Sequence, residues 1–166
     1  MAAGRTARAI AILAGGAIAA VAAVAMGTFM FQSAGLGPPA GVQLRPDDPA
    51  VVALGQRVYA AQCAACHGAR LQGQPNWRER GLDGRLPAPL HDESGHTWHH
   101  PDDMLFRITK HGVAKAANLK DYVSAMPAYD GVISDAEIVA ALSWIKAQWP
   151  ADIRARHDAL NRAAAH

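Results

Sequence analysis

Length, composition and charge limit what this chain can be. Its 166 residues suit one small domain with a short additional segment. The formal net charge of +2 is too small for a nucleic-acid-binding surface, and 6% aromatic residues are too few for base stacking. Hydrophobic residues make up 51%, which excludes general disorder, and two cysteines exclude a scaffold held by several disulfides. We therefore expect a folded domain that binds no nucleic acid.

Residues 1–31 form an apolar N-terminal segment. Arg5 and Arg8 precede an uncharged run over residues 9–31, which as a helix is about 34 Å long and can cross a hydrocarbon core about 30 Å thick. We interpret the segment as an uncleaved transmembrane helix, and the small residues Ala23-Val24-Ala25 leave a cleaved signal peptide as the alternative. In either case the two arginines favour the cytoplasmic side, so the rest of the chain lies across the membrane.

Three further stretches follow this segment. Residues 32–46 are rich in glycine and proline and break any periodicity, which indicates a linker. Residues 47–150 carry helical patterns and form the expected domain. Residues 151–166 are polar and only weakly helical in pattern, and we expect a C-terminal tail.

The domain is predicted to be all-α. Helices are expected from Pro49 into Cys63, from Pro101 to Gly112, and from Ser134 to Trp149. Asp47 or Asp48 can cap the first helix, and Ser134 with Glu137 forms a capping box at the start of the last. Residues 68–100 are mostly loop, and a loop of this length in a small domain needs something to organise it. A bound cofactor would do so.

The sequence Cys63-Ala64-Ala65-Cys66-His67 carries the clearest chemistry. Two thiols one helical turn apart can reach the two vinyl groups of one haem, and the adjacent imidazole can then bind the iron. A thioredoxin-like disulfide has the same C-x-x-C spacing but belongs in a βαβ context, which is missing. A zinc site needs four ligands, and the chain has no second cysteine pair. The motif therefore predicts one covalently attached haem c.

With this motif in place, residues 47–150 resemble the class I cytochrome c family. Gly55–Tyr59 before the motif is similar to the family's first helix, Met126-Pro127-Ala128-Tyr129 to its distal-ligand loop, and Ser134–Trp149 to its final helix. The resemblance implies a small helical domain around one haem. It also implies that Gly55 permits a close crossing of the first and last helices, with Trp144 at that crossing.

The iron needs a sixth ligand besides His67. Met126 precedes Pro127 in a loop of restricted geometry, and the family resemblance points to the same residue. Met104 shares helical spacing with apolar neighbours and is expected to fill the core. Iron with His/Met ligation has a raised reduction potential and no open site, which suits electron transfer rather than oxygen chemistry. Four clustered histidines leave an alternative ligand open: His91, His96, His99 and His100.

Weaker expectations concern the surroundings of the haem. The carbonyl of Pro87 or Pro89 can accept a hydrogen bond from His67 Nδ1 and fix its tautomer. Side chains that can bind the haem propionates are Arg70, Trp77 and Trp98. We expect no tight second metal in the histidine-rich segment 95–103, because its spacing does not make the side chains converge.

Together these observations predict a monohaem, membrane-anchored c-type cytochrome that faces the bacterial periplasm. It would carry single electrons between periplasmic or membrane redox partner proteins and would not be an enzyme. A soluble periplasmic form follows if the first segment is cleaved. The alternatives are a haem-bearing subunit fixed in a larger respiratory complex, and a haem peroxidase or sensor with a labile sixth ligand. The sequence indicates no oligomeric state.

Overall fold

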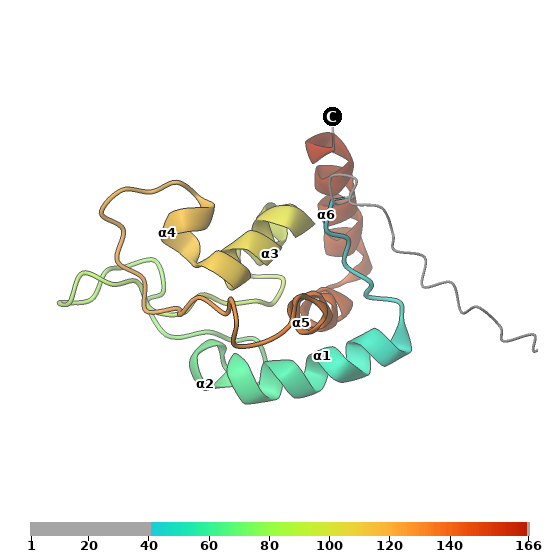
Figure 1. Ribbon diagram of the computed structural model, residues 1–166, viewed down its shortest axis with the longest axis horizontal. Helices are drawn as coiled ribbons and strands as arrows, with labels where there is room; N and C mark the ends of the chain where they lie inside the picture. Colours follow the sequence, from blue (N-terminus) through green and yellow to red (C-terminus); the bar gives the residue numbers. More distant parts are fainter. Residues whose placement is uncertain (1–40, 166) are drawn as a thin grey trace, which may run out of the picture. The chain divides into compact units, whose positions relative to one another are not determined.

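A computed structural model describes residues 41–165, and the regular secondary structure of this part of the chain is all helical, with no strand (Figure 1). The all-α prediction is therefore confirmed for these residues. The predicted N-terminal helix over residues 1–31, as anchor or signal segment, lies outside the described residues, as does most of the expected linker. Among residues 41–165, no helix is long and apolar enough to span a membrane.

The described residues contain three long helices and several short ones. In chain order they are α1 (Pro49–Gln62), α2 (Ala64–His67), η1 (a 3-10 turn, Thr97–His99), α3 (Asp102–His111), α4 (Val113–Ala116), α5 (Asp135–Ala147) and α6 (Ala151–Ala164). The predicted helices are confirmed as α1, α3 and α5. The sequence did not predict α2 or α4, because a single helical turn is too short to show a period of 3.6 residues.

Local sequence explains where two of these helices begin. The side chain of Asp48 accepts hydrogen bonds from the backbone N–H groups of Ala50 and Val51, at 3.0 and 3.2 Å. Ser134 and Glu137 form the predicted capping box at the start of α5. Each arrangement satisfies N–H groups that the first turn of a helix leaves without partners.

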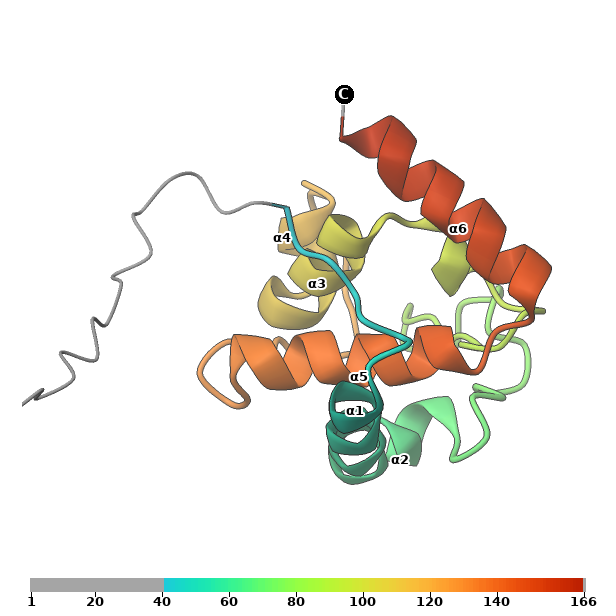
Figure 2. The same ribbon diagram turned by 90° about the vertical axis from the view of Figure 1, so that its right-hand side faces the viewer.

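Helices α1 and α5 cross at close range and carry much of the core. In Figure 1, α1 runs across the view and α5 is seen end-on. In Figure 2, α5 runs across the view and α1 is seen end-on. A Cβ atom on Gly55 would lie 1.9 Å from the carbonyl oxygen of Ala140, so only glycine permits this crossing. The rings of Tyr59 and Trp144 pack beside it, with centroids 4.6 Å apart. Both family-based expectations, for Gly55 and for Trp144, are confirmed.

The C-terminal residues form a packed helix. The expected polar, weakly helical tail is α6, which buries Ile153 and His157. Its Asp158 lies 2.6 Å from Nζ of Lys146, a lysine of α5 with only 3% of its surface exposed. The helix forms because tertiary contacts compensate for a weak local pattern, which is the usual source of helical stability in proteins.

The described end of the expected linker is also packed. Leu44 is buried, and the backbone N–H of Arg45 donates to the hydroxyl of Ser143 on α5 at 2.9 Å. The chain is therefore fixed to the domain several residues before α1 begins.

Candidate functional site

A cavity of about 650 Å³ lies beside the Cys63–His67 turn. Its size falls within the range of about 300–1,000 Å³ typical of cofactor sites. Most of its wall is apolar and comes from segments far apart in the chain: residues 86–89, helices α3 and α4, the loop 122–127 and helix α5. The long segment 68–100 thus has the role expected from its length, because much of it lines this cavity.

His67 reaches the cavity from α2 and is buried. Its Nδ1 lies 2.9 Å from the carbonyl oxygen of Pro89, so the predicted hydrogen bond is confirmed, with Pro89 rather than Pro87 as acceptor. Burial lowers the pKa of the His67 imidazole, against the opposing effect of this hydrogen bond. The ring is therefore neutral at pH 7, with the proton on Nδ1 and the Nε2 lone pair available to a metal.

Backbone pairing holds Pro89 in place. The N–H of Gln74 donates to the carbonyl of Ala88 at 2.9 Å, and that of His91 donates to Leu71 at 2.8 Å. Between these contacts Gly73 has a φ of +60°, and a Cβ there would lie 2.7 Å from backbone atoms of Pro89 and Leu90. Only glycine lets the two segments of this loop approach so closely.

Both cysteines line the same cavity as His67. Cys63 is half-buried at the end of α1, and Cys66 is exposed on α2. Burial, together with the nearby Cys66, raises the pKa of the Cys63 thiol to about 11. The structure therefore brings two thiols and one neutral imidazole to a single cavity wall.

Met126 also lines the cavity, on a loop that several contacts fix. Its backbone N–H donates to the hydroxyl of Ser124 at 3.0 Å. Three residues later, the buried Tyr129 donates its hydroxyl to the carbonyl of Gln62 at 2.7 Å, which ties the loop to the end of α1. A side chain on this loop therefore has a defined position relative to the cysteine motif.

Met104 differs from its expected role. It lines the cavity with Met126 instead of joining the buried core residues of the described part of the chain. Helical spacing predicted that Met104 lies on the apolar face of α3, which is correct. Helical spacing alone does not show whether the apolar face of a helix packs on other side chains or borders a cavity.

Of the four clustered histidines, three line the cavity: His91, His96 and His100. His91 stacks on His67, with ring centroids 4.0 Å apart, and its Nδ1 lies 2.7 Å from Oγ1 of Thr97. Burial lowers the pKa of His91 well below its usual value, and the neighbouring histidines add to this effect. His99 is exposed and stacks on Trp98 at 3.7 Å.

One part of the wall is polar. The ring of Trp77 stacks on His96, with centroids 5.2 Å apart, and the Arg78 guanidinium lies over Trp77 at 4.4 Å. Nδ1 of His96 is buried and has no hydrogen-bond partner. These side chains and His100 all line the cavity, so this part of its wall carries one permanent cation.

Two of the three suggested propionate partners are not placed for that role. Trp77 lines the cavity, whereas Arg70 and Trp98 do not. The indole N–H of Trp98 instead donates to the carbonyl of Glu93 at 3.1 Å. The sequence did not predict Arg78 or His96 as propionate partners. The permanent positive charge of Arg78, next to Trp77, was the available signal.

The family model for cytochrome c oxidase, cbb3-type, subunit III matches residues 50–145, which is more than half of the chain. The chain belongs to this family. Comparison with curated proteins and with solved structures gave no match. Family membership makes residues 50–145 a c-type cytochrome domain, whose activity is haem-based electron transfer and whose cofactor is haem c with its iron.

The residues of the cavity fit a haem. The apolar walls suit the porphyrin, the two thiols and His67 suit its vinyl groups and iron, and the Arg78 guanidinium suits its carboxylates. Among residues 41–165, no group of three or more histidine, cysteine or acidic side chains is arranged to hold a metal ion.

Proposed function

We propose that this cytochrome is a one-haem electron carrier that passes single electrons between redox proteins on the periplasmic side of a bacterial membrane. The observation that carries the proposal is the buried His67, whose Nδ1 is held by Pro89 in the cavity that also receives both cysteines. That arrangement fixes a neutral imidazole as an iron ligand and leaves the thiols to hold the macrocycle. It requires no substrate pocket and no catalytic group.

Each proposed ligand has a distinct task. Cys63 and Cys66 would hold a single haem through thioethers, and His67 and Met126 would bind its iron. The haem supplies a one-electron iron couple when it is bound. The carbonyl of Pro89 increases the basicity of His67 by accepting its Nδ1–H, and the apolar wall excludes water and so favours the less charged redox state.

Covalent attachment is the property to test first. After denaturation under reducing conditions, the wild-type chain should retain its haem, because thioethers survive both treatments. Cys66→Ser should retain haem through Cys63 alone, with a shifted absorption spectrum from the unreacted vinyl group. Ser94→Ala is the matched control and should match the wild type, because Ser94 is exposed, does not line the cavity and leaves both thiols intact. Haem that separates fully from the denatured wild type would refute the proposal.

The name of the matched family favours a second candidate function. The family is named after a subunit of an oxidase, so this domain can instead be a haem-bearing subunit fixed within a respiratory complex. The proposed anchor over residues 1–31 is compatible with either role. Membranes washed at alkaline pH, then extracted in mild detergent and sized under native conditions, separate the two. A single chain of monomeric size supports the carrier, and a large haem-containing assembly supports the subunit.

A haem peroxidase or sensor is the third candidate, and spin state distinguishes it. Met126 on a loop fixed by Ser124 and Tyr129 supports a closed sixth position. The carrier should therefore be low-spin in both oxidation states. High-spin iron in the ferrous wild type would favour the sensor.

A further inference from the structure

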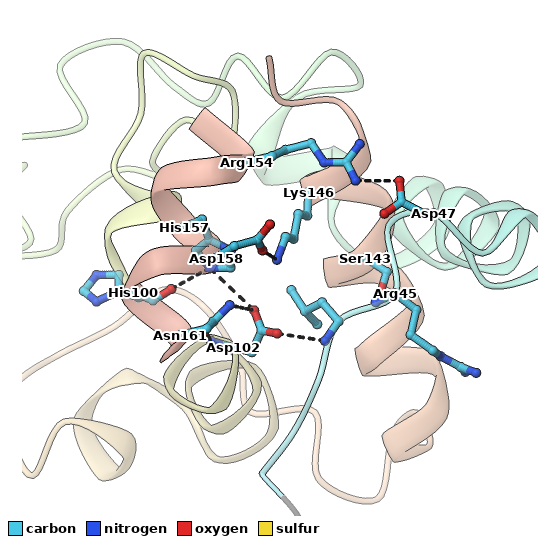
Figure 3. Close-up of polar contacts among 11 residues, drawn as sticks. Arg45, Asp47, His100, Asp102, Ser143, Lys146, Arg154, His157, Asp158 and Asn161 are labelled. Carbon is cyan, nitrogen blue, oxygen red and sulfur yellow. Dashed lines mark hydrogen bonds and ion pairs between the residues drawn. The ribbon is translucent and has the colours of Figure 1, made fainter. Parts of the chain in front are cut away.

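Helix α3 begins without a cap from its own sequence. Pro101 precedes its first residue, Asp102, and supplies no side-chain acceptor for the free N–H groups of the first turn. The N–H of Asp102 instead donates to Oδ1 of Asn161 at 2.8 Å, and Asn161 lies on α6, 59 residues further along the chain (Figure 3). The cap of one helix is therefore provided by another.

The contact between Asp102 and Asn161 runs in both directions. The amide Nδ2 of Asn161 donates to Oδ1 of Asp102 at 3.0 Å, and the backbone N–H of Leu44 donates to Oδ2 at 2.8 Å. Asp102 is only 4% exposed, so these bonds replace water around a buried carboxylate. The positive end of the α3 dipole adds to its stabilisation. The N-terminal segment, α3 and α6 thus meet at one side chain.

A second side chain of α6 holds the chain just before Pro101. The fully buried His157 has its Nε2 2.9 Å from the carbonyl oxygen of His100 (Figure 3). Its Nδ1 is buried without a partner, so the ring is neutral, donates through Nε2 and has no acceptor for a second proton. Helix α6 therefore fixes the backbone on both sides of Pro101.

The fixed segment is one wall of the cavity. His96, Thr97 and His100 line the cavity before Pro101, and Met104, Leu105 and Ile108 line it after. Helix α6 lies beyond residues 50–145, the part of the chain that the family model matches. Helix α6, although outside the matched region, thus fixes the position of this cavity wall.

We propose that Asn161 and His157 are positioning residues of the haem site: by fixing the start of α3 they set the packing of its cavity wall and thereby the reduction potential. This inference depends on the proposed function, since it requires a haem in the cavity. A loosened wall admits water, and water stabilises the more highly charged ferric state, so the potential falls. We expect about a tenfold change in the equilibrium between the two oxidation states, which is about 59 mV for one electron.

The test compares Asn161→Ala with Arg162→Ala in the full-length, haem-loaded protein. Arg162 is the next residue of α6 and is exposed, which makes it the matched control. For Asn161→Ala the midpoint potential should fall by about 59 mV, which is a tenfold change in the equilibrium constant between the two oxidation states. For Arg162→Ala it should stay at the wild-type value. Both potentials are measured at a temperature well below that of thermal unfolding, and the thermal midpoint of each variant is recorded separately. A lower thermal midpoint with an unchanged potential would mean that Asn161 only stabilises the fold, and would overturn the proposal.

Two further measurements keep the inference decidable. Asn161→Ser, a milder change, replaces Asn161→Ala if that variant does not accumulate, and the same fall is expected. Amide exchange on the wild type should show Asp102 N–H as protected as the amides of α5, and fast exchange would overturn the proposed cap. A wild type without covalent haem would overturn both proposals. A haem-loaded wild type with an unchanged Asn161→Ala potential would overturn this one alone.

Discussion

Gly55 offers the sharpest test of how the fold is built, because its substitution meets backbone atoms. A Cβ on residue 55 would lie 1.9 Å from the carbonyl oxygen of Ala140 and 2.8 Å from Cβ of Trp144. Ordinary contact begins near 3.4 Å, so α1 and α5 must separate locally by about 1.5 Å. Overpacking of a core costs about 1–3 kcal/mol, and we expect about 3 kcal/mol because no rotamer change can move a carbonyl oxygen.

Gly55→Ala also has a favourable effect that reduces the loss. Alanine is about 1 kcal/mol better than glycine in a helix interior, which leaves a net destabilisation of about 2 kcal/mol. For a domain of this size that corresponds to a fall of about 8 °C in thermal midpoint. Urea unfolding of the haem-loaded protein measures the free energy directly.

The matched control for this substitution is Gly41→Ala. Gly41 is exposed, and no atom lies within 4 Å of the position that a Cβ on it would take, so the free energy of unfolding should change little. If Gly55→Ala left the unfolding free energy unchanged or raised it, the close crossing of α1 and α5 would be wrong.

Two further predictions concern the ligand and the pH response. Met126→Ala should give high-spin or rearranged iron with a lower reduction potential, whereas Met104→Ala should keep the low-spin spectrum; the reverse result would make Met104 the ligand. Thermal stability should be fully present above about pH 6.5 and fall below it, because burial lowers the pKa of His157 from 6.5 in the folded state while the unfolded chain still takes up the proton. His157→Gln should flatten this dependence, and an equally steep profile in that variant would assign the effect to other groups. The charged side chains that act on this ring are Lys146, Asp102 and Asp158.

Signals that act over a few residues were predicted well. The cap of α1, predicted at Asp47 or Asp48 and found at Asp48, and the capping box of α5 each depend on neighbours within about four positions. The hydrogen bond from His67 to a proline carbonyl was also anticipated, since a metal-bound histidine requires such a partner. The sequence did not show whether Pro87 or Pro89 is the acceptor, because backbone hydrogen bonds between residues 71–74 and 88–91 determine which carbonyl lies beside His67.

Features that depend on contacts between distant segments could not be predicted. The helical pattern of residues 151–164 is weak, and α6 forms because His157 and Asn161 find partners 57 and 59 residues earlier. Likewise, spacing placed Met104 on an apolar face but did not show that this face borders the cavity. The polar part of the cavity wall, with Arg78 and His96, lies on a loop, and a loop has no residue periodicity from which its path can be predicted.

The ion pair between Lys146 and Asp158 bears on where this domain can be cut. The family match ends at residue 145, one position before that lysine. A chain shortened there would lack two side chains of the hydrophobic core, Trp149 and Ile153, and the acceptor that caps α3. A cytochrome module transplanted into another protein by its family limits would therefore lose part of its own interior, whereas one extended through residue 164 would keep it. The matched region is shorter than the unit whose side chains share one core.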